Sequence, residues 1–170
     1  RKLGVQEEYV SLDRSYEEME NTLKEVLNSS GKGIYLIKGQ TGLGKSYAYK
    51  KMLGELRRPV IVAVPTVILK NEIAKSMCDV AVEALSVKEL CMPLYLESDV
   101  QSLYDRGLHK EAKQKIREYA DKLENGIEKN RYKSFLHFND VIRKKNCHII
   151  MTHAFLLNMS AEQLEGYEII

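Results

Sequence analysis

Eight consecutive residues have the types and spacing of a phosphate-binding loop: Gly39, Gln40, Thr41, Gly42, Leu43, Gly44, Lys45 and Ser46. Glycines let the backbone turn its amide groups toward one phosphate, and a side chain at Gly44 would obstruct that approach. Lys45 would act as the catalytic residue by placing its charge against the β- and γ-phosphates, and the Ser46 hydroxyl would bind Mg²⁺. The G-x-x-x-x-G-K-S spacing, known as Walker A, therefore predicts a nucleoside triphosphate site.

Short runs of branched apolar residues predict the strands that would position this loop. They cover residues 34–37, 60–64, 147–152 and 167–170. The first run leads directly into the loop, and the continuous run Val60–Val64 is typical of a strand buried on both faces. Apolar residues at helical spacing predict helices at about 47–56, 67–85 and 154–159. Strands that alternate with helices indicate an α/β fold with a mostly parallel sheet.

One more helix is expected ahead of the loop. Ser15-Tyr16-Glu17-Glu18 has the spacing of a capping box, in which the Ser15 hydroxyl and the Glu18 carboxylate each cover a backbone amide. Apolar residues recur at helical spacing as far as Leu27, and residues 28–33 are expected to end this helix.

Residues 98–146 differ in character from the rest of the chain. They are polar and helix-prone, and between 105 and 146 twelve Lys and Arg stand against seven Asp and Glu, whereas the whole chain carries a net charge of only +2. The predicted organisation is therefore a sheet domain that starts in residues 1–97, a helical insertion at 98–146, and a return to the sheet domain at 147–170.

The insertion offers two features that nucleic acid would use. Its excess of positive charge would either follow the phosphates of a single strand or form a solvated helix face, and the interleaved acids favour the solvated face. Its aromatic residues would either stack bases or build a core, and their helical spacing favours the core. They are Tyr104, Tyr119, Tyr132, Phe135 and Phe138.

Hydrolysis would need more than the loop, because an acid at the end of a second strand usually holds Mg²⁺. The strand at 60–64 runs into Pro65-Thr66, and the strand at 147–152 runs into His153, so no apolar strand is expected to end in Asp or Glu. We expect this acid to follow residue 170, and we expect the chain by itself to bind nucleotide weakly without efficient turnover.

Three sequence motifs, taken in their order along the chain, resemble those of one protein family. Pro65-Thr66 after a core strand resembles motif Ia of superfamily 2 helicases, and His148–Leu157 resembles the segment before the DEAH box in the XPD/DinG group. With the Walker A loop, they make residues 30–170 similar to the first RecA-like motor domain of such a helicase, truncated before the DEAH box. One departure is that Thr152 stands where the family usually has Asn before the histidine.

The resemblance implies a P-loop NTPase fold with a RecA-like parallel sheet flanked by helices and interrupted by a helical insertion. It implies ATP and Mg²⁺ as cofactors, ATP-driven translocation on or unwinding of DNA, single-stranded DNA as partner, and a second motor domain in the same parent chain. It also implies that Thr66 and His153 contact nucleic acid. Thr66 would equally serve as a helix N-cap, and the two roles are compatible. His153 would otherwise pack against the motor core.

The cysteines bear on a further cofactor. Many members of the family hold an iron–sulfur cluster with four cysteines in the insertion, whereas this chain has only Cys78, Cys91 and Cys147. We therefore expect no iron–sulfur cluster, no disulfide framework, and Cys78 and Cys91 as small buried apolar residues. No apolar run is long enough to span a bilayer and no signal peptide is recognisable, so we expect a cytoplasmic protein without a membrane partner.

Two other functions stay open. One is a different P-loop enzyme, such as a nucleotide kinase, in which arginines of a lid would bind phosphate. The candidates are Arg106, Arg117, Arg131 and Arg143. The other is a non-enzymatic switch module that uses the nucleotide only to order itself. Strand-dependent ATPase activity would separate the motor from both.

Overall fold

The computed structural model describes residues 11–28 and 45–170. The predicted strand at 34–37 and the loop residues Gly39–Gly44 lie outside the described residues. The chain divides into two units, one ending at Arg57 and one spanning Arg58–Ile170, and each is described by itself.

The first unit contributes two described helices, α1 (Leu12–Asn28) and α2 (Lys45–Glu55). Each buries apolar residues spaced along one face: Met19, Leu23 and Leu27 in α1, and Ala48, Met52 and Leu53 in α2. The Glu20 carboxylate accepts from Lys24 Nζ at 2.7 Å and from Lys51 Nζ at 2.9 Å. These two hydrogen bonds lower the pKa of Glu20.

The start of α1 corrects the capping prediction. The helix begins at Leu12, and Ser11 Oγ accepts from Arg14 N at 3.3 Å. Ser15 lies inside the first turns, where its hydroxyl donates to Ser11 O at 3.1 Å, and Glu18 pairs with Arg14 at 3.0 Å. The predicted capping box at Ser15 is wrong because Ser11 supplies an acceptor one turn earlier.

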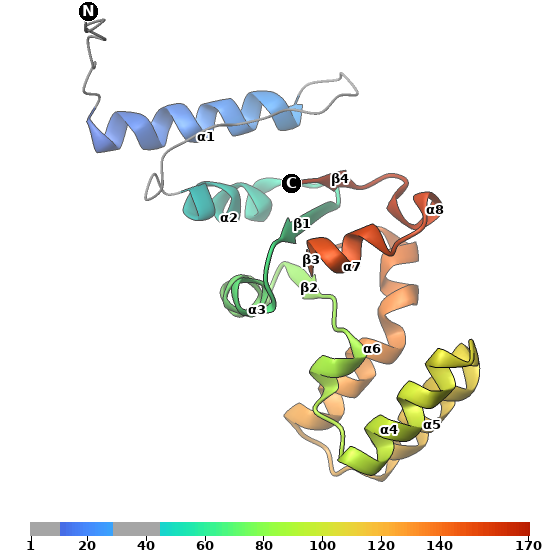
Figure 1. Ribbon diagram of the computed structural model, residues 1–170. Coiled ribbons are helices and arrows are strands. Elements are labelled where there is room, and N and C mark those ends of the chain that lie inside the picture. Colours follow the sequence, from blue (N-terminus) through green and yellow to red (C-terminus); the bar gives the residue numbers. More distant parts are fainter. Residues whose placement is uncertain (1–10, 29–44) are drawn as a thin grey trace, which may run out of the picture. The chain divides into compact units, whose positions relative to one another are not determined.

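The second unit is built on a four-stranded parallel sheet in the order β2–β3–β1–β4 (Figure 1). The strands are β1 (Val60–Val64), β2 (Ala81–Glu83), β3 (His148–Thr152) and β4 (Glu168–Ile169). β1 and β3 are the central pair, with Ile61 opposite Ile149 and Val64 opposite Thr152. The prediction of an α/β fold with a parallel sheet flanked by helices is confirmed.

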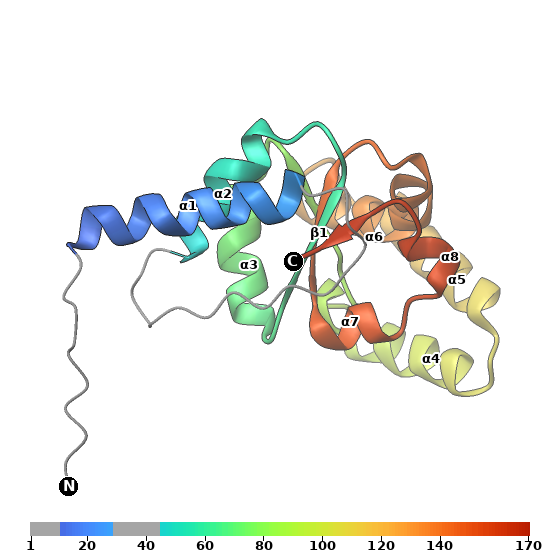
Figure 2. The same ribbon diagram turned by 90° about the horizontal axis from the view of Figure 1, so that it is seen from above.

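Helices cover both faces of this sheet (Figures 1 and 2). Ile61, Ile149 and Met151 pack with Phe138 and Ile142 of α6 (Ile127–Lys144), and partly buried residues of α7 (His153–Leu157) and α8 (Ala161–Leu164) complete that cluster. Helix α3 (Val67–Ser76) lies on the opposite face. Because side chains alternate along a strand, the buried Val62 and Ile150 point to that opposite face.

The predicted helix at 67–85 is wrong in its second half. Helix α3 ends at Ser76, where Met77 N donates to Ala74 O at 3.2 Å, and the chain then forms β2. β2 is three residues long and pairs in parallel with β3, Val82 lying opposite Ile149. Strand pairing thus overrides a local pattern that is compatible with a helix.

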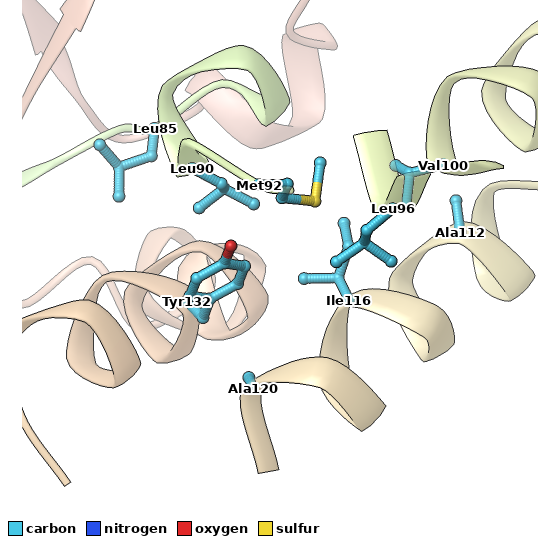
Figure 3. Close-up of a cluster of buried hydrophobic side chains, with 9 residues drawn as sticks. All are labelled: Leu85, Leu90, Met92, Leu96, Val100, Ala112, Ile116, Ala120 and Tyr132. Atoms are coloured by element: carbon cyan, nitrogen blue, oxygen red, sulfur yellow. The ribbon is translucent and has the colours of Figure 1, made fainter. Parts of the chain in front are cut away.

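The predicted helical character of residues 98–146 is confirmed, but the predicted start at 98 is wrong because it falls inside α4 (Leu94–Asp105). The helical segment, called the insertion below, consists of the short 3₁₀ helix η1 (Val87–Leu90), α4, α5 (His109–Lys122) and the first half of α6, and it has its own core (Figure 3). The fully buried Val100, Ile116 and Tyr132 lie at its centre. The predicted core role is confirmed for Tyr132 and Phe138, which are buried, and for Tyr104, Tyr119 and Phe135, which are partly buried against this core.

The cysteine predictions have mixed outcomes. Cys78 and Cys91 are exposed, so the expectation that they are small buried residues is wrong. Cys91 ends η1 in the left-handed conformation, with φ 53°, which places it at a turn and not in the core. All three cysteines have free thiols, and burial raises the pKa of Cys147.

A buried lysine joins the sheet to the insertion. Lys70 of α3 has no exposed surface, and its Nζ donates to Ala84 O at 2.8 Å, to Glu89 at 2.5 Å and to Glu83 at 3.0 Å. Arg131 Nε of α6 donates to the carbonyl of the same Glu89 at 2.9 Å. Burial alone would raise the pKa of Glu89, but hydrogen bonds from Lys70 and Ser86 outweigh it and lower the pKa.

We predict that Lys70→Met lowers the free energy of unfolding by about 3–5 kcal/mol, because it leaves two carboxylates and a carbonyl without their cation. Lys75→Met, at the exposed end of the same helix, is the control and is expected to change it by less than about 0.5 kcal/mol. Urea denaturation followed by circular dichroism measures both. Equal stability of the two variants would contradict the role given to Lys70.

We also predict opposite effects from two tyrosine-to-phenylalanine changes. The Tyr132 hydroxyl is buried and has no hydrogen-bond partner among the described residues, and burial raises its pKa to about 12. Tyr132→Phe should therefore raise the free energy of unfolding by about 1 kcal/mol. Tyr167→Phe should lower it by about the same amount, because Tyr167 Oη donates to Ile142 O at 3.1 Å. A loss of stability in both variants would refute this prediction.

Candidate functional site

The carboxyl ends of β1 and β3 form one edge of the sheet. Val64 lies opposite Thr152, so the two strands end at the same level. β1 continues into α3 on one face of the sheet, and β3 continues into α7 on the other (Figure 2). In open parallel sheets, ligands bind outside the carboxyl ends of two such strands, where the chain departs to opposite faces.

Thr66 stands at this edge as the N-cap of α3. Its backbone is extended (φ −132°, ψ 152°), and its Oγ1 accepts from Leu69 N at 3.2 Å. The N-cap role foreseen for Thr66 is therefore confirmed. Contact of Thr66 with nucleic acid stays a prediction, and the positive end of the ten-residue helix behind it favours an anion at this place.

His153 stands at the same edge. Its ring Nε2 lies 3.2 Å from Ala63 O of β1, while the residue as a whole is exposed. The ring thus ties the end of β3 to the end of β1, and its contact with nucleic acid stays a prediction. Thr152, just before it, caps α7 by accepting from Phe155 N at 3.2 Å. This cap was missed, although a threonine after a strand and before a helix repeats the pattern at Thr66.

Lys45 and Ser46 occupy the first turn of α2. A helix thus begins at the last two residues of the Walker A pattern, as that pattern requires. The other predicted phosphate-binding residues, Gly39 to Gly44, lie outside the described residues. The structure therefore brings Thr66 and His153 to one edge of the second unit, and it places Lys45 and Ser46 together in the first unit.

The expectation that no strand ends in an acid is wrong for β2, which ends in Glu83. This carboxylate lies 3.0 Å from Lys70 Nζ, and β2 is an edge strand that β3 separates from β1. Glu83 is therefore already paired with a cation. Within 11–28 and 45–170, no group of three or more His, Cys, Asp and Glu side chains is arranged to hold a metal ion.

In the part of the chain that the structure describes, no helix has both the length and the apolar character needed to cross a membrane. Searches against protein-family models, curated proteins and solved structures each return no match.

We predict that Thr66→Ala lowers the free energy of unfolding by about 1 kcal/mol, because Leu69 N loses its acceptor. Thr66→Ser keeps a hydroxyl at the same place and should restore most of that stability. Chemical denaturation of the two variants measures the difference. If serine and alanine were equally destabilising, the cap would not be the source of the effect.

Proposed function

We propose that this chain is the ATP-binding part of a motor that moves on single-stranded DNA, built on a RecA-like P-loop fold. Gly39–Ser46 holds the triphosphate, with Lys45 against the β- and γ-phosphates and Ser46 on Mg²⁺. Thr66 and His153 face the DNA strand. A second motor domain and the acid that completes hydrolysis come from outside residues 1–170.

The observation that carries this proposal is that α2 begins at Lys45, directly after the six residues Gly39–Gly44 of the Walker A pattern. A helix at this position turns its positive end and its first free amides toward the phosphates. The edge formed by Thr66 and His153 supports the nucleic-acid part, because backbone phosphates bind hydroxyls, imidazoles and helix N-termini.

The nucleotide-kinase alternative needs arginines that are free to move with a lid. Arg131, one of its four candidates, donates to Glu89 O at 2.9 Å and belongs to the joint between the sheet and the insertion. This contact makes Arg131 part of the packing between elements and favours a fixed helical insertion over a mobile lid at this residue.

Calorimetric titration of the chain with Mg²⁺–ATP tests the nucleotide site. We expect saturable binding that Lys45→Ala weakens by at least about tenfold, because a charge-assisted contact to phosphate is lost. Lys50→Ala on the same helix removes an equal charge outside the motif and should leave binding unchanged. Absence of binding by the unsubstituted chain, or equal weakening by both variants, would refute the proposal.

A further inference from the structure

A pocket of about 220 Å³ lies between the second half of α6 and the segment that follows β3. Phe138 and Asn139 of α6 form one side, and residues 155–163 form the other. The lining residues are Phe138, Asn139, Phe155, Asn158, Met159 and Gln163. The pocket is smaller than the roughly 300–1,000 Å³ of sites that enclose a drug-sized ligand, so it suits one small ring system.

The floor of the pocket is aromatic. Phe138 is buried, and its ring packs edge-on against Phe155, with centroids 5.4 Å apart and planes at 81°. Met159 adds a polarizable thioether to the same wall. Flat heteroaromatic rings bind to such a surface, because stacking on aromatic side chains stabilises any base.

The rest of the lining consists of carboxamides with hydrogen-bonding capacity to spare. Asn158 Nδ2 donates to Ala154 O at 2.7 Å, which leaves its oxygen as an acceptor. Gln163 Oε1 accepts from Ser160 N at 3.0 Å, which leaves its amide nitrogen as a donor. The side chain of Asn139 makes no hydrogen bond to any other described residue, so it offers both. No charged side chain lines the pocket, which favours a neutral ligand with donors and acceptors on one edge.

The pocket also lies beside the edge proposed for DNA. Phe155 N donates to Thr152 Oγ1 in the first turn of α7, the helix that begins with His153. This side of the pocket therefore lies within one helical turn of His153. Arg143 is exposed four residues after Asn139 on α6, which puts it on the same helix face. Two of the five Lys and Arg of α6, Lys129 and Arg131, already donate to backbone carbonyls, which leaves Lys133, Arg143 and Lys144. Arg143 is the nearest of these to Asn139 in the sequence, and it would offer its charge to a phosphate of the bound strand.

We propose that this pocket receives one base of a single-stranded nucleic acid, turned out of the strand, with Asn139 hydrogen-bonding the edge of the base and Phe155 contacting its ring. Asparagine is suited to this because its amide donates and accepts side by side, as the edge of a base does. The inference rests on the proposed function, since it names a base-binding site beside the DNA edge of the motor.

The test measures the affinity of the chain for fluorescent single-stranded DNA of about ten nucleotides by anisotropy. A second probe has the same sugar-phosphate backbone without bases, and adenosine is a third. Asn139→Leu should weaken binding of the base-containing probe about tenfold and leave binding of the abasic probe unchanged. Asn130→Leu, in the exposed first turn of the same helix, is the matched control and should change neither.

Each result decides between the two proposals. If the chain binds DNA and Asn139→Leu behaves like Asn130→Leu, the base pocket is refuted and the motor proposal stands. If Asn139→Leu weakens both probes alike, its effect is not on a base and the pocket is again refuted. If adenosine binds as tightly as the DNA and depends on Asn139, the pocket serves a free nucleoside and not a strand. If neither DNA probe binds, the DNA part of the proposed function fails, and the base pocket fails with it.

Discussion

The parallel pairing of β1 with β3 is the constraint on which the second unit depends. It joins two strands whose first residues, Val60 and His148, lie 88 residues apart in the sequence. Val60 N also donates to His148 Nδ1 at 3.2 Å. Register at this pair places Val64 beside Thr152, and thereby fixes which residues begin the helices on each face. The same alternation directs Ile61, Ile149 and Met151 into one core and Val62 and Ile150 into the other.

Local chemistry explains why much of the fold could be predicted from the sequence. The branched runs at 60–64 and 147–152 have no helical alternative that would bury them as well, and both form central strands. Likewise, the helix after the Walker A loop follows from the pattern itself. The N-cap at Thr66 was foreseen because a threonine between a strand and an apolar helical pattern has few other local roles.

The errors arise where distant contacts decide. Nothing local distinguishes Ala81–Glu83 from the end of a helix, and it becomes a strand because β3 offers it an unpaired edge. In the sequence, Lys70 has the pattern of an ordinary polar position on a helix. Its burial depends on three partners that come 13 to 19 residues later, namely Glu83, Ala84 and Glu89. The pocket at Asn139 depends in the same way on helices α6 to α8, which are distant in sequence and meet on one face of the sheet.

Helix α6 belongs to two cores at once. Tyr132, near its start, is buried in the core of the insertion, while Phe138 and Ile142, farther along, are buried against the sheet. The helix has eighteen residues, a length of about 27 Å, and it contains neither glycine nor proline, the residues at which helices most often kink. We therefore expect the insertion and the sheet to unfold in one cooperative transition, because loss of either core removes the packing that holds half of this helix.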